Sequence, residues 1–283
     1  MSLQSFRFGT VGAPISTPKK PGGSVGAILR LAELDLKALE LGWVRAVQVT
    51  EKTCAAIKAT AVEKDIALSV HAPYFINLNA DDEEWPKSRK RLMDAAYYGN
   101  LAGATDIVFH PGSYFGKQPN QVLPLAIERL AGCVEDLRTA SNPVCLRPET
   151  MGKSAMLGSF EDTLEMSKEI PGVKPCLDFA HLHARPGDGS VNSYDEWARL
   201  LEIYGRYLGN QAFGDLHVHL SGIQYGPKGE REHLMIENAD LDIPALFSAL
   251  RDFGCGGRIL CESPVMEDDA QRLQQTWHEL NTA

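Results

Sequence analysis

Residues 144–178 read VCLRPETMGKSAMLGSFEDTLEMSKEIPGVKPCLD and contain one complete strand–helix–strand unit. Val144–Glu149 and Val173–Asp178 are short apolar runs of strand length, and each of them ends in a carboxylate. Ser159 is followed three residues later by an acid, which is the spacing of a capping box and predicts a helix over Ser159–Ile170. The stretch therefore predicts two parallel strands joined by a crossover helix.

Similar units repeat on both sides of this stretch. The predicted strands are Phe6–Gly9, Val44–Val49, Ile66–His71, Asp106–His110, Val144–Glu149, Val173–Asp178, Asp215–Leu220 and Arg258–Glu262. Between Val25 and Leu39, apolar residues recur at helical spacing, and Gly42 is positioned to end that helix. The other predicted helices are Cys54–Lys64, Glu83–Leu101, Val122–Thr139, Ser159–Ile170, Ser193–Tyr207, Asp242–Phe253 and Glu267–Leu280.

Eight strand–helix units without a linker favour a closed (β/α)8 TIM barrel of the α/β class, with residues 1–283 as a single domain. An open, doubly wound sheet is the alternative arrangement of such units. The glycine fingerprint that binds dinucleotides in many doubly wound sheets is missing after the first strand.

The composition indicates a protein without a membrane partner. Of its 283 residues, 44% are hydrophobic and 23% are charged, as in average water-soluble proteins. The net charge of −9 argues against a surface that holds nucleic acid non-specifically. The sequence lacks both an eighteen-residue apolar run and the pattern of a signal peptide. The six cysteines form no Cys-x-x-Cys pair and are interpreted as reduced thiols, so we expect a cytoplasmic protein.

Histidine and carboxylate side chains stand at the ends of the predicted strands or in the loops that follow them. In a (β/α)8 barrel these strand ends surround one mouth, where several unpaired carboxylates would repel one another unless cations were bound. Imidazole and carboxylate are ligands of zinc, manganese and iron. The pattern therefore predicts a metal site, whose candidate ligands are His71, His110, Glu149, Asp178, His181, His219, His233 and Glu262.

Other residues near this pattern are interpreted differently. His217 and His219 share one face of a strand, because they are two residues apart. His219 is favoured as the ligand since it is nearer the strand end, and His217 is interpreted as packing beside the ligands. His183 is interpreted as a neighbour of the ligands or a loop residue, and Cys261 as part of the core.

An ordered series of motifs carries a family resemblance. The motifs are HAPYFINL (71–78), FHPGS (109–113), PETMG (148–152), DFAH (178–181), HLSG (219–222) and CES (261–263). Their order and spacing resemble the endonuclease IV family of metal-dependent apurinic/apyrimidinic (AP) endonucleases over most of the chain. The resemblance implies a monomeric (β/α)8 barrel that acts on damaged double-stranded DNA. It also implies two to three Zn²⁺ ions, with Mn²⁺ or iron as alternatives in part of the cluster.

The resemblance further implies three ligand groups. They are His71, His110 and Glu149 for the first metal; Glu149, Asp178, His219 and Glu262 for the second; and His181 with His233 for the third. The family normally adds an aspartate two residues before the last histidine, but Arg231 stands there and cannot bind zinc. Either Glu230 or Glu232 substitutes, or the third site is weak or empty. The family's asparagine after the Glu149 position is likewise replaced, by Thr150.

The implied reaction is hydrolysis of the phosphodiester 5′ to an abasic site. Adjacent metal ions provide a nucleophile at neutral pH and stabilise charge on the phosphate. The resemblance makes Glu149 and Glu262 catalytic, with Glu262 orienting a hydroxide held between the first two metals. Tyr74 and Phe75 match residues that the family inserts into the damaged duplex, and packing at the barrel rim is their alternative role.

Two other functions fit part of the pattern. A single-metal sugar or sugar-phosphate isomerase or epimerase of the xylose-isomerase-like superfamily needs only Glu149, Asp178, His219 and Glu262. His71 and His110 distinguish the two enzymes, because a one-metal epimerase does not need them as ligands. A metal-binding protein without catalysis is the third reading.

Overall fold

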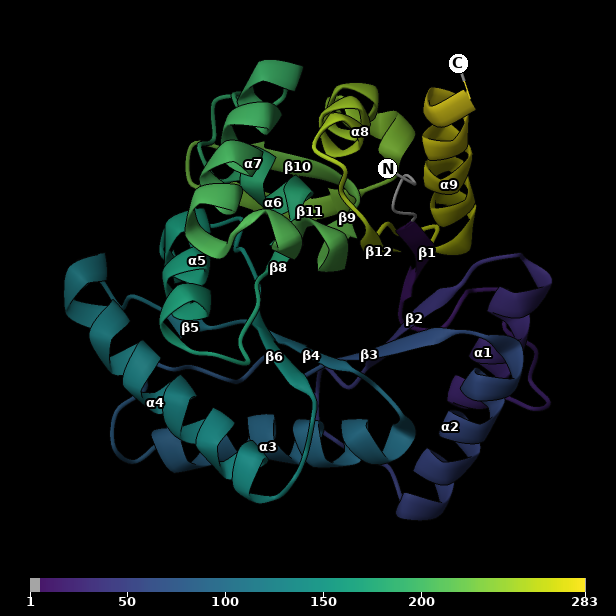
Figure 1. Cartoon of the computed structure of the whole chain (residues 1–283), viewed down its shortest axis with the longest axis horizontal. Helices are drawn as coiled ribbons and strands as arrows, with labels where there is room; N and C mark the ends of the chain where they lie inside the picture. Colours follow the sequence, from purple (N-terminus) through teal and green to yellow (C-terminus); the bar gives the residue numbers. More distant parts are fainter. Residues whose placement is uncertain (1–5, 283) are drawn as a thin grey trace.

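The computed structural model describes residues 6–282, and its centre is a sheet of eight parallel strands (Figure 1). In sheet order from one end, the strands are β6 (Cys145–Pro148), β4 (Asp106–Phe109), β3 (Ala67–His71), β2 (Ala38–Gly42), β1 (Phe6–Val11), β12 (Gly257–Cys261), β9 (Leu216–Leu220) and β8 (Cys176–Asp178). Each strand lies beside its neighbours in chain order. The predicted barrel is thus confirmed, and the doubly wound alternative, whose strand order reverses, is wrong.

The two ends of this sheet meet at a narrow seam between β6 and β8. Two isolated parallel bridges cross it, namely Leu146 with Val173 and Glu149 with Cys176. The hydroxyl of Thr150 also spans the seam, because it accepts a hydrogen bond from Asp178 N at 2.8 Å and donates one to Asp178 O at 3.3 Å. Thr150 therefore helps to close the barrel.

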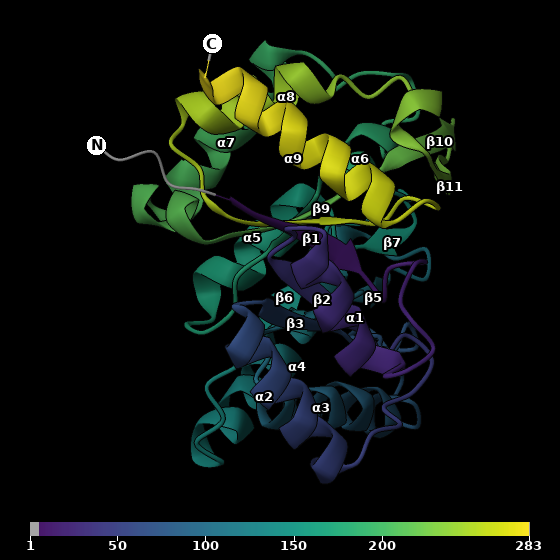
Figure 2. The same ribbon diagram turned by 90° about the vertical axis from the view of Figure 1, so that its right-hand side faces the viewer.

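Helices surround the barrel on its outside (Figures 1 and 2). They are α1 (Gly23–Glu33), α2 (Glu51–Lys64), α3 (Trp85–Ala102), α4 (Pro119–Thr139), α5 (Phe160–Glu169), α6 (Phe179–Ala184), α7 (Tyr194–Leu208), α8 (Ile243–Asp252) and α9 (Glu267–Thr282). Ser159 caps α5 by accepting a hydrogen bond from Asp162 N at 3.1 Å, as its spacing predicts. Figure 2 shows α9 across the outside of β1, where the rings of Phe6 and Trp277 lie 5.0 Å apart. Among the helices of residues 6–282, none is both long and apolar enough to cross a membrane.

The prediction for the second strand is wrong. The sequence favours a helix that runs to Leu39 and a strand over Val44–Val49, whereas α1 ends at Glu33 and β2 occupies Ala38–Gly42. Asp35 adopts a left-handed φ of 56°, which a continuing helix does not accommodate. The apolar residues before Gly42 fit the helical period by coincidence, and in the structure they form a buried strand.

The inside of the barrel is polar through much of its depth. At the N-terminal ends of the strands, Asp106 of β4 pairs with Arg147 of the neighbouring strand β6. It also lies 2.9 Å from Arg258 of β12, across the barrel. Farther along, Glu40 of β2 lies 2.9 Å from His217 Nε2 of β9, across the barrel. Branched apolar side chains fill most barrels of this type. In this barrel, charged and imidazole side chains occupy the interior from its base towards its mouth.

Two short antiparallel strand pairs stand where the sequence predicts only loops. One joins β5 (Gly112–Ser113) to β7 (Met156–Leu157), and the other joins β10 (Gly222–Gly226) to β11 (Gly229–Leu234). Both follow barrel strands at their C-terminal ends, so they form part of the mouth.

Candidate metal centre

All eight predicted ligands gather at the C-terminal ends of the barrel strands. They fall into three groups within which the ligand atoms lie no more than 4.8 Å apart: His71, His110 and Glu149; Glu149, Asp178, His219 and Glu262; and Asp178, His181 and His233. A cavity of about 290 Å³ opens over them. Its lining includes Tyr74, Lys153 and Glu230 beside five of the predicted ligands.

The strands and one short helix position these side chains. His71 is the last residue of β3, and His110, Glu149 and Glu262 each follow directly after a barrel strand. Asp178 ends β8 and caps α6, because its Oδ1 accepts a hydrogen bond from His181 N at 2.7 Å. This cap starts α6 directly after β8, and the first turn of the helix brings His181 over the mouth.

Glu149 lies at the centre of the cluster. Its Oε2 is 3.3 Å from both His71 Nε2 and His110 Nε2, and its Oε1 is 3.5 Å from His219 Nδ1. Two ligand atoms on one tetrahedral zinc ion, each bonded at about 2.1 Å, are about 3.4 Å apart. The carboxylate therefore has the geometry to join two metal positions, as the resemblance implies.

Several polar atoms in the cluster have no protein partner. Glu149 Oε1, Asp178 Oδ2 and His219 Nδ1 are buried without a hydrogen bond from any residue that the structure describes. Leaving such atoms unsatisfied is costly, and a cation removes that cost. A set of imidazole nitrogens and carboxylate oxygens suits zinc, manganese or iron. The residues present thus fit a divalent metal centre.

Contacts within the cluster favour the charged forms of its carboxylates and imidazoles. Burial opposes ionisation of Glu149, but the charge of His110 and contacts from nearby histidines hold the pKa of that carboxyl well below its usual range. Burial likewise opposes protonation of His71, yet Glu149 raises its pKa to about 9. Against the same effect of burial, Asp178 and Glu149 raise the pKa of His181 to about 10. Without metal, both imidazoles are therefore protonated at neutral pH.

Metal binding at this centre is expected to release protons. At pH 7 a divalent ion must displace the protons of His71 and His181, since only the neutral imidazole is a ligand. Apparent affinity should therefore rise with pH until about 9 to 10, and fall at lower pH. Calorimetric titration with Zn²⁺ in buffers of different ionisation enthalpy measures the number of protons released. A heat that is independent of the buffer would contradict the expectation.

Three other residues lie outside the ligand groups or below them. His217 reaches Glu40, and burial lowers its pKa to about 4 although Glu40 opposes this. His183 is buried in α6, where its Nε2 lies 3.1 Å from Asp240. Cys261 is fully buried in the core, and burial raises its thiol pKa to about 12. None of them faces the cavity over the cluster.

Glu40 contacts the cluster from below, and it is not among the residues identified from the sequence. Its Oε1 lies 3.0 Å from His219 Nε2, and its Oε2 accepts a hydrogen bond from Ser69 at 2.7 Å. With the Nε2 edge of His219 against this carboxylate, Nδ1 faces Glu149 and Glu262. The available signal is an acid between two leucines in a buried run, which the predicted helix conceals.

Tyr74 and Phe75 stand at the rim of the mouth with much of their surface exposed. Tyr74 is 51% exposed, and its ring stacks on that of His110 with centroids 4.9 Å apart. Phe75 is 65% exposed and lies beneath the guanidinium of Arg91, 6.0 Å from its ring centroid. Packing at the rim, the alternative role, therefore explains the position of the Tyr74 ring in part and leaves most of the Phe75 ring without a contact.

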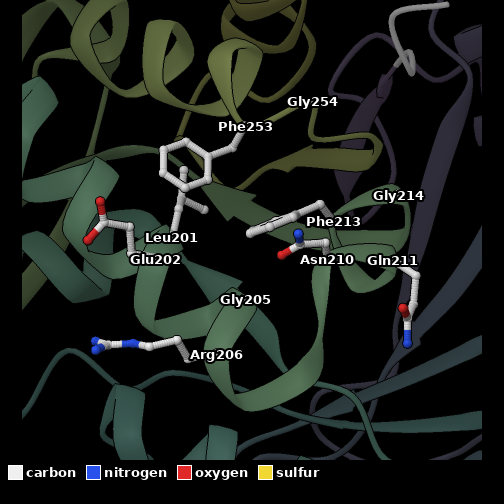
Figure 3. A pocket seen from close by; sticks show the side chains of 10 residues that line it. All are labelled: Leu201, Glu202, Gly205, Arg206, Asn210, Gln211, Phe213, Gly214, Phe253 and Gly254. Carbon is white, nitrogen blue, oxygen red and sulfur yellow. The ribbon is translucent and has the colours of Figure 1, made fainter. Parts of the chain in front are cut away.

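A larger cavity of about 670 Å³ lies on another part of the molecule (Figure 3). It is lined by Leu201 and its neighbours in α7, by Phe213 in the 3-10 helix Asn210–Asp215, and by Phe253. Figure 3 shows the apolar side chains of Leu201, Phe213 and Phe253 around the middle of the view, with polar side chains on both sides of them. The eight predicted ligands lie elsewhere, so size alone does not identify the site.

Sequence relatives include endonucleases and a protein of undescribed activity. The chain is 36% identical over 274 residues to an uncharacterised protein of Methanocaldococcus jannaschii, which covers 96% of this chain and 97% of the relative. It is 31% identical over 165 residues to endonuclease 4 of Thermus thermophilus. That alignment spans 53% of this chain and 57% of the endonuclease, little more than half of each.

Solved structures show the same fold in enzymes of two kinds. A D-tagatose 3-epimerase-like protein has a TM-score of 0.72 at 18% identity, covering 96% of this chain and 97% of its own. Endonuclease IV from Thermus thermophilus has a TM-score of 0.68 at 22% identity, covering 95% and 99%. The model of the xylose isomerase-like TIM barrel family matches residues 28–280. The predicted resemblance is confirmed at this level, and the chain belongs to the xylose isomerase-like TIM barrel family.

Proposed function

We propose that this protein is a metal-dependent endonuclease that hydrolyses the phosphodiester 5′ to abasic sites in duplex DNA. The observation that supports this most is the pairing of His71 and His110 with one oxygen of Glu149, both at 3.3 Å. A single-metal sugar enzyme would be complete without these histidines. Their placement supports a second metal position beside the group of Glu149, Asp178, His219 and Glu262.

The residues of the mouth have distinct tasks in this reaction. Divalent ions held there supply the positive charge that activates water and stabilises the phosphate. Glu149 belongs to both ligand groups and would bind both ions. Glu262 lines the cavity, where it can orient the attacking water. Lys153 lines the same cavity and offers its ammonium to a phosphate oxygen.

The rim offers a way to recognise the lesion. An abasic site lacks one base, so the cost of unstacking the duplex is lowest there. Tyr74 and Phe75 present exposed aromatic surface beside the ligands, where an inserted ring would replace the missing stack. The acidic net charge of −9 disfavours tight binding to undamaged DNA, which fits recognition by shape at the lesion.

The proposed activity has a direct test. Protein reconstituted with Zn²⁺ or Mn²⁺ is incubated with a duplex that carries one tetrahydrofuran abasic analogue, which resists cleavage by elimination. We expect a single nick immediately 5′ to the analogue, with a 3′-hydroxyl end, and its loss on adding EDTA. An intact duplex of the same sequence serves as the control. No EDTA-sensitive nick at the analogue would overturn the proposal.

A sugar epimerase is the second candidate, because the four ligands of the shared metal group alone would serve a one-metal enzyme. The cavity of about 290 Å³ is also of a size that suits a small ligand. Incubation with ketohexoses and Mn²⁺, followed by separation of the sugars, tests this candidate. Epimerised sugar without any DNA cleavage would make it the better assignment.

A further inference from the structure

The hairpin of β10 and β11 contains a bulge at Arg231, the position where the resemblance puts an aspartate. Its register pairs Ile223 with His233 and Tyr225 with Glu230, whereas Arg231 has no partner of its own. Ile223 and Tyr225 are two residues apart and face the same side of their strand. Residues opposite one another in an antiparallel pair share a face, so His233 and Glu230 do so as well. The bulge at Arg231 therefore places Glu230 on the same face of the hairpin as the candidate ligand His233.

Glu230 reaches the outer ligands of the cluster. Its Oε2 lies 3.5 Å from His181 Nε2, and His233 Nε2 lies 3.3 Å from the same nitrogen. Both distances match the separation of about 3.4 Å expected for two ligands of one tetrahedral zinc ion. All three side chains line the cavity over the mouth.

The two histidines present their free nitrogens to this position. His181 Nδ1 lies 2.9 Å from Thr150 O, and His233 Nδ1 lies 3.3 Å from Glu262 O. A carbonyl oxygen can only accept, so each Nδ1 carries a hydrogen, and in the neutral imidazole that binds a metal each Nε2 keeps the lone pair. The two Nε2 atoms face each other at 3.3 Å, so a divalent ion that displaces the second proton of His181 would meet both lone pairs at one position. Backbone contacts that orient a ligand histidine in this way are usual at metal sites.

The chain also holds Glu230 in place and turns Arg231 away. Glu230 N donates a hydrogen bond to Gly152 O at 3.0 Å, which fixes the start of β11 against the loop after β6. A Cβ on Gly152 would come within 2.9 Å of the His181 ring and 2.7 Å of Glu230 Cβ, so only glycine permits this approach. The guanidinium of Arg231 lies instead against Gly226, 2.8 Å from where a Cβ would stand.

We propose that Glu230 is the carboxylate ligand of a third divalent metal ion, which it binds together with His181 and His233. It takes the place of the aspartate that the resemblance puts at position 231. This inference rests on the metal centre of the proposed function and adds one site to it. Neither Arg231 nor the exposed Glu232 on the other face of the hairpin takes part.

The test compares Glu230→Ala with Glu232→Ala, which removes the same group from the opposite face of the same strand. Each protein is stripped with a chelator, reloaded with Zn²⁺ and titrated by calorimetry, and its zinc is counted by elemental analysis. We expect three sites in the natural protein and in Glu232→Ala. In Glu230→Ala one step should be lost or weakened at least about tenfold. Circular dichroism confirms that each variant is folded.

The remaining outcomes separate this inference from the proposed function. Equal stoichiometry and affinity in both variants, or only two sites in the natural protein, would overturn the role of Glu230. Loss of a site in Glu232→Ala alone would do the same. A protein that binds three ions through Glu230 and leaves abasic DNA uncut would support the inference while contradicting the endonuclease assignment.

Discussion

Replacing Glu262 with glutamine is expected to lower the rate of abasic-site cleavage about a thousandfold while the barrel stays folded. Glu262 Oε1 lies 3.3 Å from His219 Nδ1, and its Oε2 lies 3.7 Å from His233 Nδ1, so the carboxylate faces two ligand groups at once. Glutamine keeps the shape of the side chain but removes its charge and turns one acceptor into a donor. Initial rates on the tetrahydrofuran duplex at saturating metal measure the effect.

Glu232→Gln is the matched control for this variant. Glu232 is exposed on the outer face of β11, and the same substitution there should leave the rate unchanged. Thermal melts of both proteins establish that neither loses the fold. If Glu262→Gln retains the rate of the control, Glu262 takes no part in the chemistry and the proposed division of tasks at the mouth is incorrect.

Replacing Asp106 with asparagine is expected to lower the free energy of unfolding by about 3–5 kcal/mol. Asp106 is buried at the base of the barrel with the fully buried Arg147, and Arg258 lies 2.9 Å from its Oδ2. Removing the carboxylate takes away the anion that Arg258 shares with the fully buried Arg147, and it leaves Arg147 with only the half-exposed Asp215 as a charged partner. Urea unfolding of the metal-free protein, followed by tryptophan fluorescence, measures the loss.

Asp65→Asn provides the control, because it breaks an aspartate–arginine pair at the surface. Asp65 lies 3.0 Å from Arg7, and the two side chains are 72% and 43% exposed. An exposed pair of this kind contributes about 0–1 kcal/mol. An Asp106 variant that loses no more stability than this control would show that the buried pairs contribute little.

The same carboxylate predicts how stability changes with pH. Burial opposes ionisation of Asp106, but Arg147 and Arg258 hold its pKa well below the usual range. Its contribution is therefore complete above the pKa of an unfolded aspartate, about 3.9, and is lost as the pH falls towards the folded value. The variant and the natural protein should thus become more similar in stability as the solution is acidified.

The barrel and the eight candidate ligands could be predicted because one feature determines both. A short apolar run predicts a parallel strand, and its last residue lies at the mouth whatever the packing around it. His71 and Asp178 follow from this rule directly. The rule fails for β2, where leucines before Gly42 match the helical and the strand period together, and only the left-handed Asp35 decides between them.

Glu40 and Glu230 could not be assigned from sequence for different reasons. The partner of Glu40 is His217, which lies 177 residues away on the far side of the barrel, so no local pattern connects them. The orientation of Glu230 depends on a bulge and on the hydrogen bond to Gly152, both of which arise when the hairpin packs on the loop after β6. Simple alternation places Arg231 on the ligand side, and the structure does not.

The seam between β6 and β8 has a consequence for local opening. Most neighbouring strands share continuous ladders, whereas here two single bridges and the Thr150 hydroxyl join the sheet ends. Amide hydrogens along this line should therefore exchange with solvent sooner than those of β1 or β12. Glu149 and Asp178 stand on opposite sides of the seam, and an ion held by both would act as a crosslink between them. Slower exchange there on adding metal would report occupancy independently of catalysis.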